Sequence, residues 1–407
     1  MESKIYEELK TQLNTELSNH ILPYWIERAM GSKQSGFAGR IDGNNILVED
    51  APKSVILGTR MLWTFASAYR IYGNPSHREV ADSLFHYIEK YFWDETYGGL
   101  YWMITHDGKP QAMKKHTYAQ SFAIYAYSEY NRATGNEVAL QKAVQMFKLL
   151  EKHSQNYTER GYYEAFDRQW YGIEDVRLSN GDDLEARSMN THLHVLEALT
   201  NLTRVWADKA LDIRMRKLMD LMINVIYNSR EKHFQTFFTE LWEPTTNCYS
   251  YGHDIEAAWL ILEAVNEIKD QKLVNEAEKI AVEVAYSTLH EGVDHTAGGI
   301  YNGGAGGQVV DTDKQWWAQA EAIVGFCHAY KLNGDIKFLV AAKDTWDFIS
   351  KFVKDHEHGE WFFQVNKFGV PYHNEDKAGP WKCPYHTARA CFELTEKDFN
   401  VRLRSGM

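Results

Sequence analysis

The chain has 407 residues, of which 44% are hydrophobic and 25% charged, an ordinary composition for a globular protein with a substantial core. Its net charge of -12, with both signs interspersed, argues against a nucleic-acid-binding surface. No apolar run reaches membrane length and no signal-peptide h-region is visible, so we expect a cytoplasmic protein without a membrane partner. The four cysteines show no CxxC spacing, so we expect reduced thiols and no disulfide framework or zinc site.

Six similar units follow one another along the chain, and each contains a short phrase rich in glycine or aromatic residues. The successive phrases are "QSGFAGRIDG" at Gly36, "TYGGLYW" at Gly98, "ERGYYEAF" at Gly161, "REKHFQTFF" at His233, "AGGIYN" at Gly298 and "EHGEWFF" at Gly359. They recur every 61 to 72 residues. A steady period of this kind is typical of repeat architectures, in which each unit is one supersecondary element.

Each unit is predicted to be a pair of helices with a short extended or hairpin excursion between them. The segment before the phrase carries one apolar stripe, as in "VADSLFHYIEKYFWD". The segment after it is apolar nearly all round, as in "ILGTRMLWTFASAY", and often ends at a glycine that suits a helix C-cap. Six pairs with one buried and one amphipathic helix predict an all-α protein, an (α/α)6 barrel forming a single domain over residues 1–407. An open solenoid is the alternative.

Polar residues recur near the start of each inner segment, where a closed barrel brings the helix starts together at one end of its axis. They are 58 to 76 residues apart, which follows the repeat and not a local pattern. These residues are Arg60, Tyr118, His194, His253, Glu321 and His386. Asn190 and Glu197 share the helical face of His194. His192 lies about 200° away and is predicted to pack or to face solvent.

His253 and Glu256 stand one helical turn apart, so the carboxylate can reach the ring and fix its tautomer. Such a pair could also be structural, or half of a metal site. The presence of His194, His253 and His386 at matching repeat positions favours acid/base chemistry. Zinc held by these three rings is the metal alternative, but no HExxH motif or Cys-His cluster is present, and Arg60 at the same level would repel a cation. We therefore predict a site without a metal ion.

The chain resembles the N-acylglucosamine 2-epimerase superfamily, and within it the cellobiose 2-epimerases most of all. The similarity runs over nearly the whole chain, from about "ILPYW" to "CFEL". The stretches that carry it are "GRIDG", "GGLYWM", "KKHTYAQSFAIYA", "EAFDRQW", "MNTHLHVLEA", "SYGHDIEAAWL", "WWAQAEAIVGF" and "GPWKCPYH". Together these stretches are a specific signal, whereas any one of them alone is weak.

The resemblance implies a barrel enzyme without a metal or nucleotide cofactor that inverts C2 of the reducing-end aldose of cellobiose or of lactose-type β-1,4-disaccharides. It implies that His253 and His386 are an acid/base pair on the two sides of the sugar, with His194 assisting. Arg60 would hold the developing oxyanion, and Glu256 and Glu321 would orient the histidines. The residues expected to bind the sugar are Trp317 and Trp381, by stacking, together with Trp316, Tyr118 and Asn190.

A C2 proton is acidic only when C1 is a carbonyl, so we expect ring opening, a cis-enediolate stabilised by Arg60, and return of the proton from the other face. Histidine suits both transfers, because its ordinary pKa of about 6.5 lies near neutrality. The alternatives are a mannose/glucose 2-epimerase or an aldose-ketose isomerase acting on a monosaccharide. An (α/α)6 glycoside hydrolase would need a pair of Asp or Glu residues. A sugar-binding toroid without activity would need no acid/base set.

Two stretches depart from the family pattern. "PYHTARAC" stands where PYHNGRMC is expected, which keeps His386 but changes its neighbours, and "IYNGGAGGQVVDTDKQWW" is a glycine-rich rim loop. Both could alter the site for the second sugar, so the preference between a disaccharide and a monosaccharide stays open. A small-molecule sugar is the expected partner, and the protein is expected to be a monomer or a weak homodimer.

Overall fold

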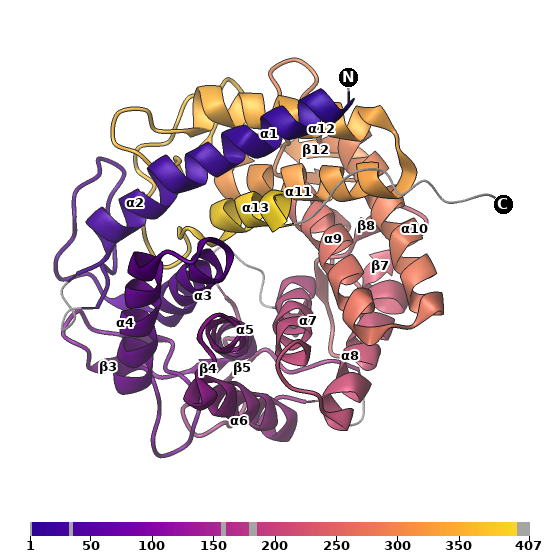
Figure 1. The fold of residues 1–407 in the computed structure, drawn as a ribbon. Coiled ribbons are helices and arrows are strands. Elements are labelled where there is room, and N and C mark those ends of the chain that lie inside the picture. Colours follow the sequence, from indigo (N-terminus) through magenta and orange to yellow (C-terminus); the bar gives the residue numbers. More distant parts are fainter. Residues whose placement is uncertain (1, 32–35, 156–159, 179–184, 397–407) are drawn as a thin grey trace.

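The computed structural model describes residues 2–31, 36–155, 160–178 and 185–396, and its helices form two concentric rings (Figure 1). The inner helices are α3 (Val55–Tyr72), α5 (Thr117–Thr134), α7 (Met189–Thr203), α9 (Tyr251–Ile268), α11 (Trp316–Asn333) and α13 (Tyr385–Glu396). Each packs against the next, and α13 packs against α3. The ring is therefore closed, which confirms the predicted (α/α)6 barrel and excludes the open solenoid.

The outer ring surrounds these helices and is completed by the N-terminal part of the chain. Its members are α1 (Glu2–Glu16), α4 (Pro75–Tyr91), α6 (Glu137–His153), α8 (Lys209–Leu221), α10 (Gln271–Ser287) and α12 (Ile336–Phe348). Short turns extend some of them, namely η1 (Leu17–Ile21), α2 (Leu22–Tyr24), η2 (Trp25–Ala29), η3 (Met222–Ile226), η4 (Thr288–Gly292) and η5 (Ile349–Val353). Because α1 packs against α12 and α13, the first and last described helices form the sixth pair (Figure 1).

The two sets of helices differ in burial as the sequence predicts. In α3 every residue of Val55–Ala68 is buried, whereas α4 buries only one stripe. Gly73, Gly135 and Gly334 end three inner helices with positive φ angles of 66°, 72° and 74°, a conformation that strains a residue carrying a Cβ. Although the inner helices are so apolar, none of the helices in the described residues combines the length and hydropathy of a membrane span.

Short antiparallel strands link each unit to the next at one end of the barrel. They are β1 (Lys53–Ser54), β2 (Met103–Ile104), β3 (Pro110–Ala112), β4 (Lys115–His116), β5 (Ala165–Phe166), β6 (Arg187–Ser188), β7 (Tyr227–Asn228), β8 (His233–Phe234), β9 (Phe237–Phe238), β10 (Cys248–Ser250), β11 (Gly303–Ala305), β12 (Gln308–Asp311), β13 (Lys314–Gln315) and β14 (Gln364–Val365). The strand before an inner helix pairs with a strand that follows the next outer helix, as in β1-β2, β4-β5, β6-β9, β10-β11 and β13-β14. This pairing fixes the helix starts relative to one another.

A buried histidine holds the start of α9, the helix that carries His253. His233 Nδ1 lies 2.7 Å from Asp254 Oδ2, its Nε2 lies 3.2 Å from Glu291 Oε2, and its ring stacks on Tyr249. Burial opposes a charge on this ring, but the two carboxylates outweigh burial and raise the His233 pKa above its ordinary value. Asp254 belongs to the first turn of α9, so the contact positions that turn.

We expect His233→Gln to lower the thermal melting temperature, and to lower it more at about pH 6 than at about pH 9. A histidine whose pKa is raised by folding contributes stability that is fully present below its unfolded pKa of about 6.5 and is lost as the pH rises through the folded pKa. Melting curves of the wild type and the variant across this pH range measure the effect, with the exposed His106→Gln as control. An equal loss at every pH would contradict a charged His233.

Candidate active site

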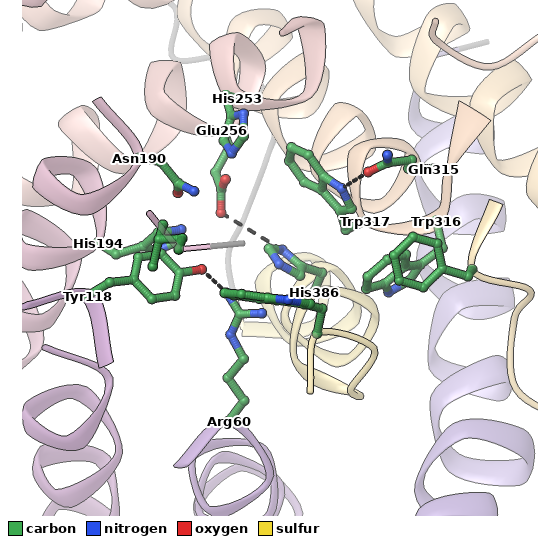
Figure 2. Close-up of a pocket in the computed structure, with 13 residues that line it drawn as sticks. Arg60, Tyr118, Asn190, His194, His253, Glu256, Gln315, Trp316, Trp317 and His386 are labelled. Atoms are coloured by element: carbon green, nitrogen blue, oxygen red, sulfur yellow. Dashed lines mark hydrogen bonds and ion pairs between the residues drawn. The ribbon is translucent and has the colours of Figure 1, made fainter. Parts of the chain in front are cut away.

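The inner helices deliver polar side chains to a cavity of about 300 Å³ at the end of the barrel where these helices begin (Figure 2). The residues that line it are Arg60, Tyr118, Leu178, Asn190, His194, His253, Glu256, Gln315, Trp316, Trp317, Phe363, Trp381 and His386. All residues predicted for the site are among them except Glu321, which is fully buried and contacts His386. The repeat has thus brought the predicted residues together.

Arg60 presents a buried cation to this cavity. Its Nη2 donates to the Tyr118 hydroxyl at 2.6 Å, and its guanidinium packs on the rings of Phe122 and Tyr385. Burial disfavours the charge, but Tyr118 and Cys383 favour it, and the net effect raises the Arg60 pKa. Among the described residues no carboxylate forms an ion pair with Arg60. The guanidinium is therefore available to a negative charge that develops on a bound molecule.

Two of the three histidines are held by a carboxylate at the same ring nitrogen. His386 Nδ1 lies 2.7 Å from Glu321 Oε1, and His194 Nδ1 lies 2.8 Å from Glu197 Oε2. An ionised carboxylate only accepts hydrogen bonds, so each Nδ1 carries a proton that it donates to the carboxylate, and each Nε2 is the nitrogen left for a bound molecule. The predicted contact of Glu321 with a histidine is therefore present.

Burial keeps His253 and His386 neutral. It lowers the pKa of His386 well below the ordinary value, and the charges of Arg60 and Arg389 lower it further. Burial, with a smaller effect of His194, lowers the pKa of His253 to about 3. At neutral pH both rings are thus in the form that a general base requires.

The predicted contact between Glu256 and His253 is wrong. Among the described residues the His253 side chain has no hydrogen-bond partner, and its ring packs 4.7 Å from the Trp317 ring. The Glu256 Oε1 instead accepts from Arg389 and lies 3.8 Å from His386 Nδ1 (Figure 2). The sequence spacing places Glu256 and His253 on one face of α9, but Arg389 comes from α13 and attracts the carboxylate away from the ring.

Glu256 and Asn190 offer unpaired polar atoms at the cavity. Glu256 Oε2 and Asn190 Oδ1 are buried and have no hydrogen-bond partner among the described residues. Burial, together with the negative charge of Glu321, raises the pKa of Glu256 to about 7. A carboxyl group with this pKa can give or take a proton near neutrality, which is typical of catalytic sites.

Arg389 is a residue of the site that the sequence reasoning missed. Its guanidinium donates to Glu197, Glu256 and Glu321, the last at 2.6 Å. The sequence does contain a signal for it, because Arg389 stands one helical turn after His386 in a mostly apolar segment. A buried arginine needs carboxylates nearby, since an unpaired buried charge is costly.

The same arginine bears on the metal alternative. Among the described residues, one group of potential ligands is close enough to hold an ion, with atoms of Glu256, Glu321 and His386 within 4.8 Å of one another. The Arg389 guanidinium already bonds both carboxylates, so a metal cation beside it would be repelled. The three rings considered as zinc ligands do not form such a group within the described part of the chain.

Tryptophan side chains form the apolar part of the wall. The Trp317 ring packs against both His253 and His386, with centroids 4.7 and 5.5 Å apart (Figure 2). Trp381 lines the cavity as well. Trp316 is only 2% exposed, so it supports the wall more than it offers a free face. Flat aromatic surfaces beside polar groups suit a ligand with both C–H faces and hydroxyl groups.

Comparison with known proteins gives a consistent result. The family model described as N-acylglucosamine 2-epimerase matches residues 36–390. Cellobiose 2-epimerase of Bacteroides fragilis is 41% identical over 95% of this chain and 98% of its own length, and that of Ruminococcus albus is 34% identical over 96% and 99%. The solved cellobiose 2-epimerase of Bacillus thermoamylovorans is 37% identical, with a TM-score of 0.91 over 96% of this chain and 99% of that one.

Proposed function

This chain belongs to the N-acylglucosamine 2-epimerase family and is a carbohydrate 2-epimerase, and we propose that it inverts C2 of the reducing-end sugar of cellobiose and of related β-1,4-disaccharides. The observation that carries the proposal is the placement of two neutral histidines, His253 and His386, around one cavity with the cation of Arg60, which has no carboxylate partner among the described residues. The names of the relatives at 41% and 34% identity support the disaccharide.

Ring opening is the first step of the proposed reaction. The O1 proton is removed and the ring oxygen is protonated as the C1–O5 bond breaks, which gives the open-chain aldehyde. We assign this exchange to Glu256 and the adjacent His386, because the pKa of Glu256 is about 7 and its Oε2 has no other hydrogen-bond partner among the described residues.

Proton transfer at C2 is the second step. One histidine removes the C2 proton through its Nε2, the electron pair moves into the C1–C2 bond, and the C1 oxygen becomes negative. Arg60 stabilises this cis-enediolate, since its charge is buried and has no carboxylate partner in the described residues. The other histidine takes up a proton from solvent at its cavity-facing nitrogen and returns it to the opposite face of C2, and the first ring releases the abstracted proton to solvent. His253 and His386 both pack on Trp317, so both can reach one sugar.

The arrangement of carboxylates favours an epimerase over a glycoside hydrolase. A hydrolase needs two carboxyl groups flanking the scissile bond, at about 5 to 9.5 Å from each other. Glu256 is the one carboxylate among the described residues that line the cavity. Glu197 and Glu321 are buried outside it and bond to Arg389 and to histidines.

A monosaccharide isomerase is the second candidate. The D-mannose isomerase of Marinomonas mediterranea is 23% identical to this chain, well below the relatives named cellobiose 2-epimerase. The higher identity favours the disaccharide, whereas the departures around His386 are the reason to test both sugars.

The test is proton NMR of the purified, chelator-treated protein in heavy water, with cellobiose and separately with mannose. We expect glucosyl-mannose carrying deuterium at C2, because the bases exchange their protons with solvent. Activity on mannose alone would show that the protein acts on a monosaccharide and not on a disaccharide. Release of free glucose from cellobiose would show hydrolysis, and the absence of any reaction with either sugar would contradict both functions.

A further inference from the structure

Arg389 lies in a buried layer next to the cavity and does not line it. It is 1% exposed, and its guanidinium packs between the rings of Tyr385 and Trp259, at 4.3 and 4.8 Å from their centroids. The Tyr385 hydroxyl also donates to Glu197, so Tyr385 belongs to the same buried layer. Arg389 is therefore out of reach of a bound sugar, and any effect on catalysis must pass through its neighbours.

Each terminal nitrogen of Arg389 bonds a carboxylate that contacts a different histidine. Nη1 donates to Glu197 Oε1, and the other oxygen of Glu197 lies 2.8 Å from His194 Nδ1. Nη2 donates at 2.6 Å to Glu321 Oε1, which lies 2.7 Å from His386 Nδ1. The rings belong to α7 and α13, so one guanidinium supports histidines on separate helices.

We propose that Arg389 is the shared positioning residue of the acid/base site, holding the carboxylates of His194 and His386 in place so that both rings keep a proton on Nδ1 and direct Nε2 toward the sugar. The proposal rests on the proposed function, because it assigns these rings their part in the epimerisation. It identifies one cation as the common support of a pair of bases.

The charges in the layer give the physical reason. The side chains of Glu197, Glu256 and Glu321 are each at most 3% exposed, and all three bond to the single positive charge of Arg389. Burial raises the pKa of both Glu197 and Glu321, and Arg389 acts against burial in both. With the His194 contact the pKa of Glu197 falls below its ordinary value, whereas the pKa of Glu321 stays above its ordinary value although Arg389 lowers it. Without the guanidinium, desolvation and mutual repulsion would place protons on these groups.

Protonation of the carboxyl groups would change the rings. A protonated carboxyl can donate a hydrogen bond, so Nδ1 of the ring would become an acceptor and the ring proton would move to Nε2. A ring with its proton on Nε2 has no lone pair facing the cavity and cannot act as a base there. Loss of Arg389 is thus expected to disable His194 and His386 together.

The direct test is to observe the tautomers. Long-range 1H–15N spectra of histidine-labelled protein at neutral pH should show the proton on Nδ1 of His194 and His386 in the wild type. Arg389→Met, which keeps an unbranched side chain without the charge, should shift both rings toward Nε2–H. Arg389→Lys should restore the wild-type tautomers only in part, because its ammonium group keeps the positive charge but cannot bridge three carboxylates as the planar guanidinium does. Unchanged tautomers in both variants would overturn the proposal.

Kinetics supply the second readout. In Arg389→Met we expect kcat to fall about 10²-fold with KM nearly unchanged, because the bases are misplaced and the sugar contacts remain. The acid limb of the kcat/KM profile should move to higher pH, since removal of a positive charge raises carboxyl pKa values. Arg214→Met is the matched control, because Arg214 is also buried and paired with Glu151, but lies between outer helices. It should lower stability and leave the profile unchanged.

The outcomes separate this proposal from the proposed function. A wild type with the expected tautomers but no exchange at C2 would overturn the function. A wild type that epimerises, with a pH profile that Arg389→Met or Arg389→Lys leaves in place, would overturn the positioning role alone. If Arg389→Met does not fold, the tautomers and pH profile of Arg389→Lys decide the matter.

Discussion

Asparagine in place of His386 is expected to lower kcat about 10²- to 10⁴-fold, the usual contribution of a general acid/base group. The ring is 5% exposed, neutral and oriented by Glu321 at 2.7 Å, and the amide of asparagine can still donate to that carboxylate. The fold should therefore persist while the base is lost. Turnover of cellobiose by proton NMR, with circular dichroism to verify folding, measures the effect.

Exchange at C2 distinguishes two bases from one. If His386 and His253 serve opposite faces of the sugar, each single variant should still exchange the C2 proton of one epimer with solvent deuterium, but not that of the other. His192→Asn is the control, because His192 is buried on α7, where its Nδ1 is 2.7 Å from the Ser188 carbonyl. It should cost stability without stopping turnover. Wild-type turnover by His386→Asn or His253→Asn would refute the two-base assignment.

Methionine in place of Arg60 is expected to lower kcat/KM about 10²- to 10³-fold, the usual cost of removing one donor to a developing oxyanion. Arg60 is 3% exposed and its Nη2 donates to Tyr118, so the positive charge stands at the cavity without a carboxylate partner in the described residues. Both epimerisation and C2 exchange should slow together, because the enediolate precedes both. Initial rates in heavy water give the two quantities in one experiment.

Arg70 provides the matched control for Arg60. Both lie on α3, but Arg70 is in its last turn, where it pairs with Glu129 and Glu396. Arg70→Met should lower the melting temperature and leave kcat/KM unchanged. A similar loss of activity in both variants would mean that the effect of Arg60→Met comes from a general disturbance of α3.

The helix rings could be predicted because their signals are local and repeated. An apolar stripe or an all-round apolar segment depends only on residues within a few turns, and a glycine at a helix end, such as Gly73 or Gly334, reflects the left-handed conformation needed there. The choice between His194 and His192 was predictable for the same reason. His192 is bonded to Ser188 and Tyr162 away from the cavity, as its helical angle predicts.

The hydrogen-bond partners inside the site could not be predicted in the same way. Spacing along α9 favoured a contact of Glu256 with His253, and nothing local revealed that the carboxylate would bond Arg389. Contacts between separate inner helices decide the matter, and they depend on differences of an ångström that a repeat period does not specify. The raised pKa of Glu256, to about 7, follows from this burial beside Glu321.

By itself the sequence determined the helix pairs and the polar side chains at the starts of the inner helices, because periodic apolar patterns fold locally and recur with the repeat. The packing of α13 on α3 decided that the pairs form a closed ring and not an open solenoid. Only the tertiary structure decided which carboxylate supports which histidine and that His253 has none among the described residues. The physical reason is the single buried charge of Arg389, which draws Glu197, Glu256 and Glu321 from three helices to one point.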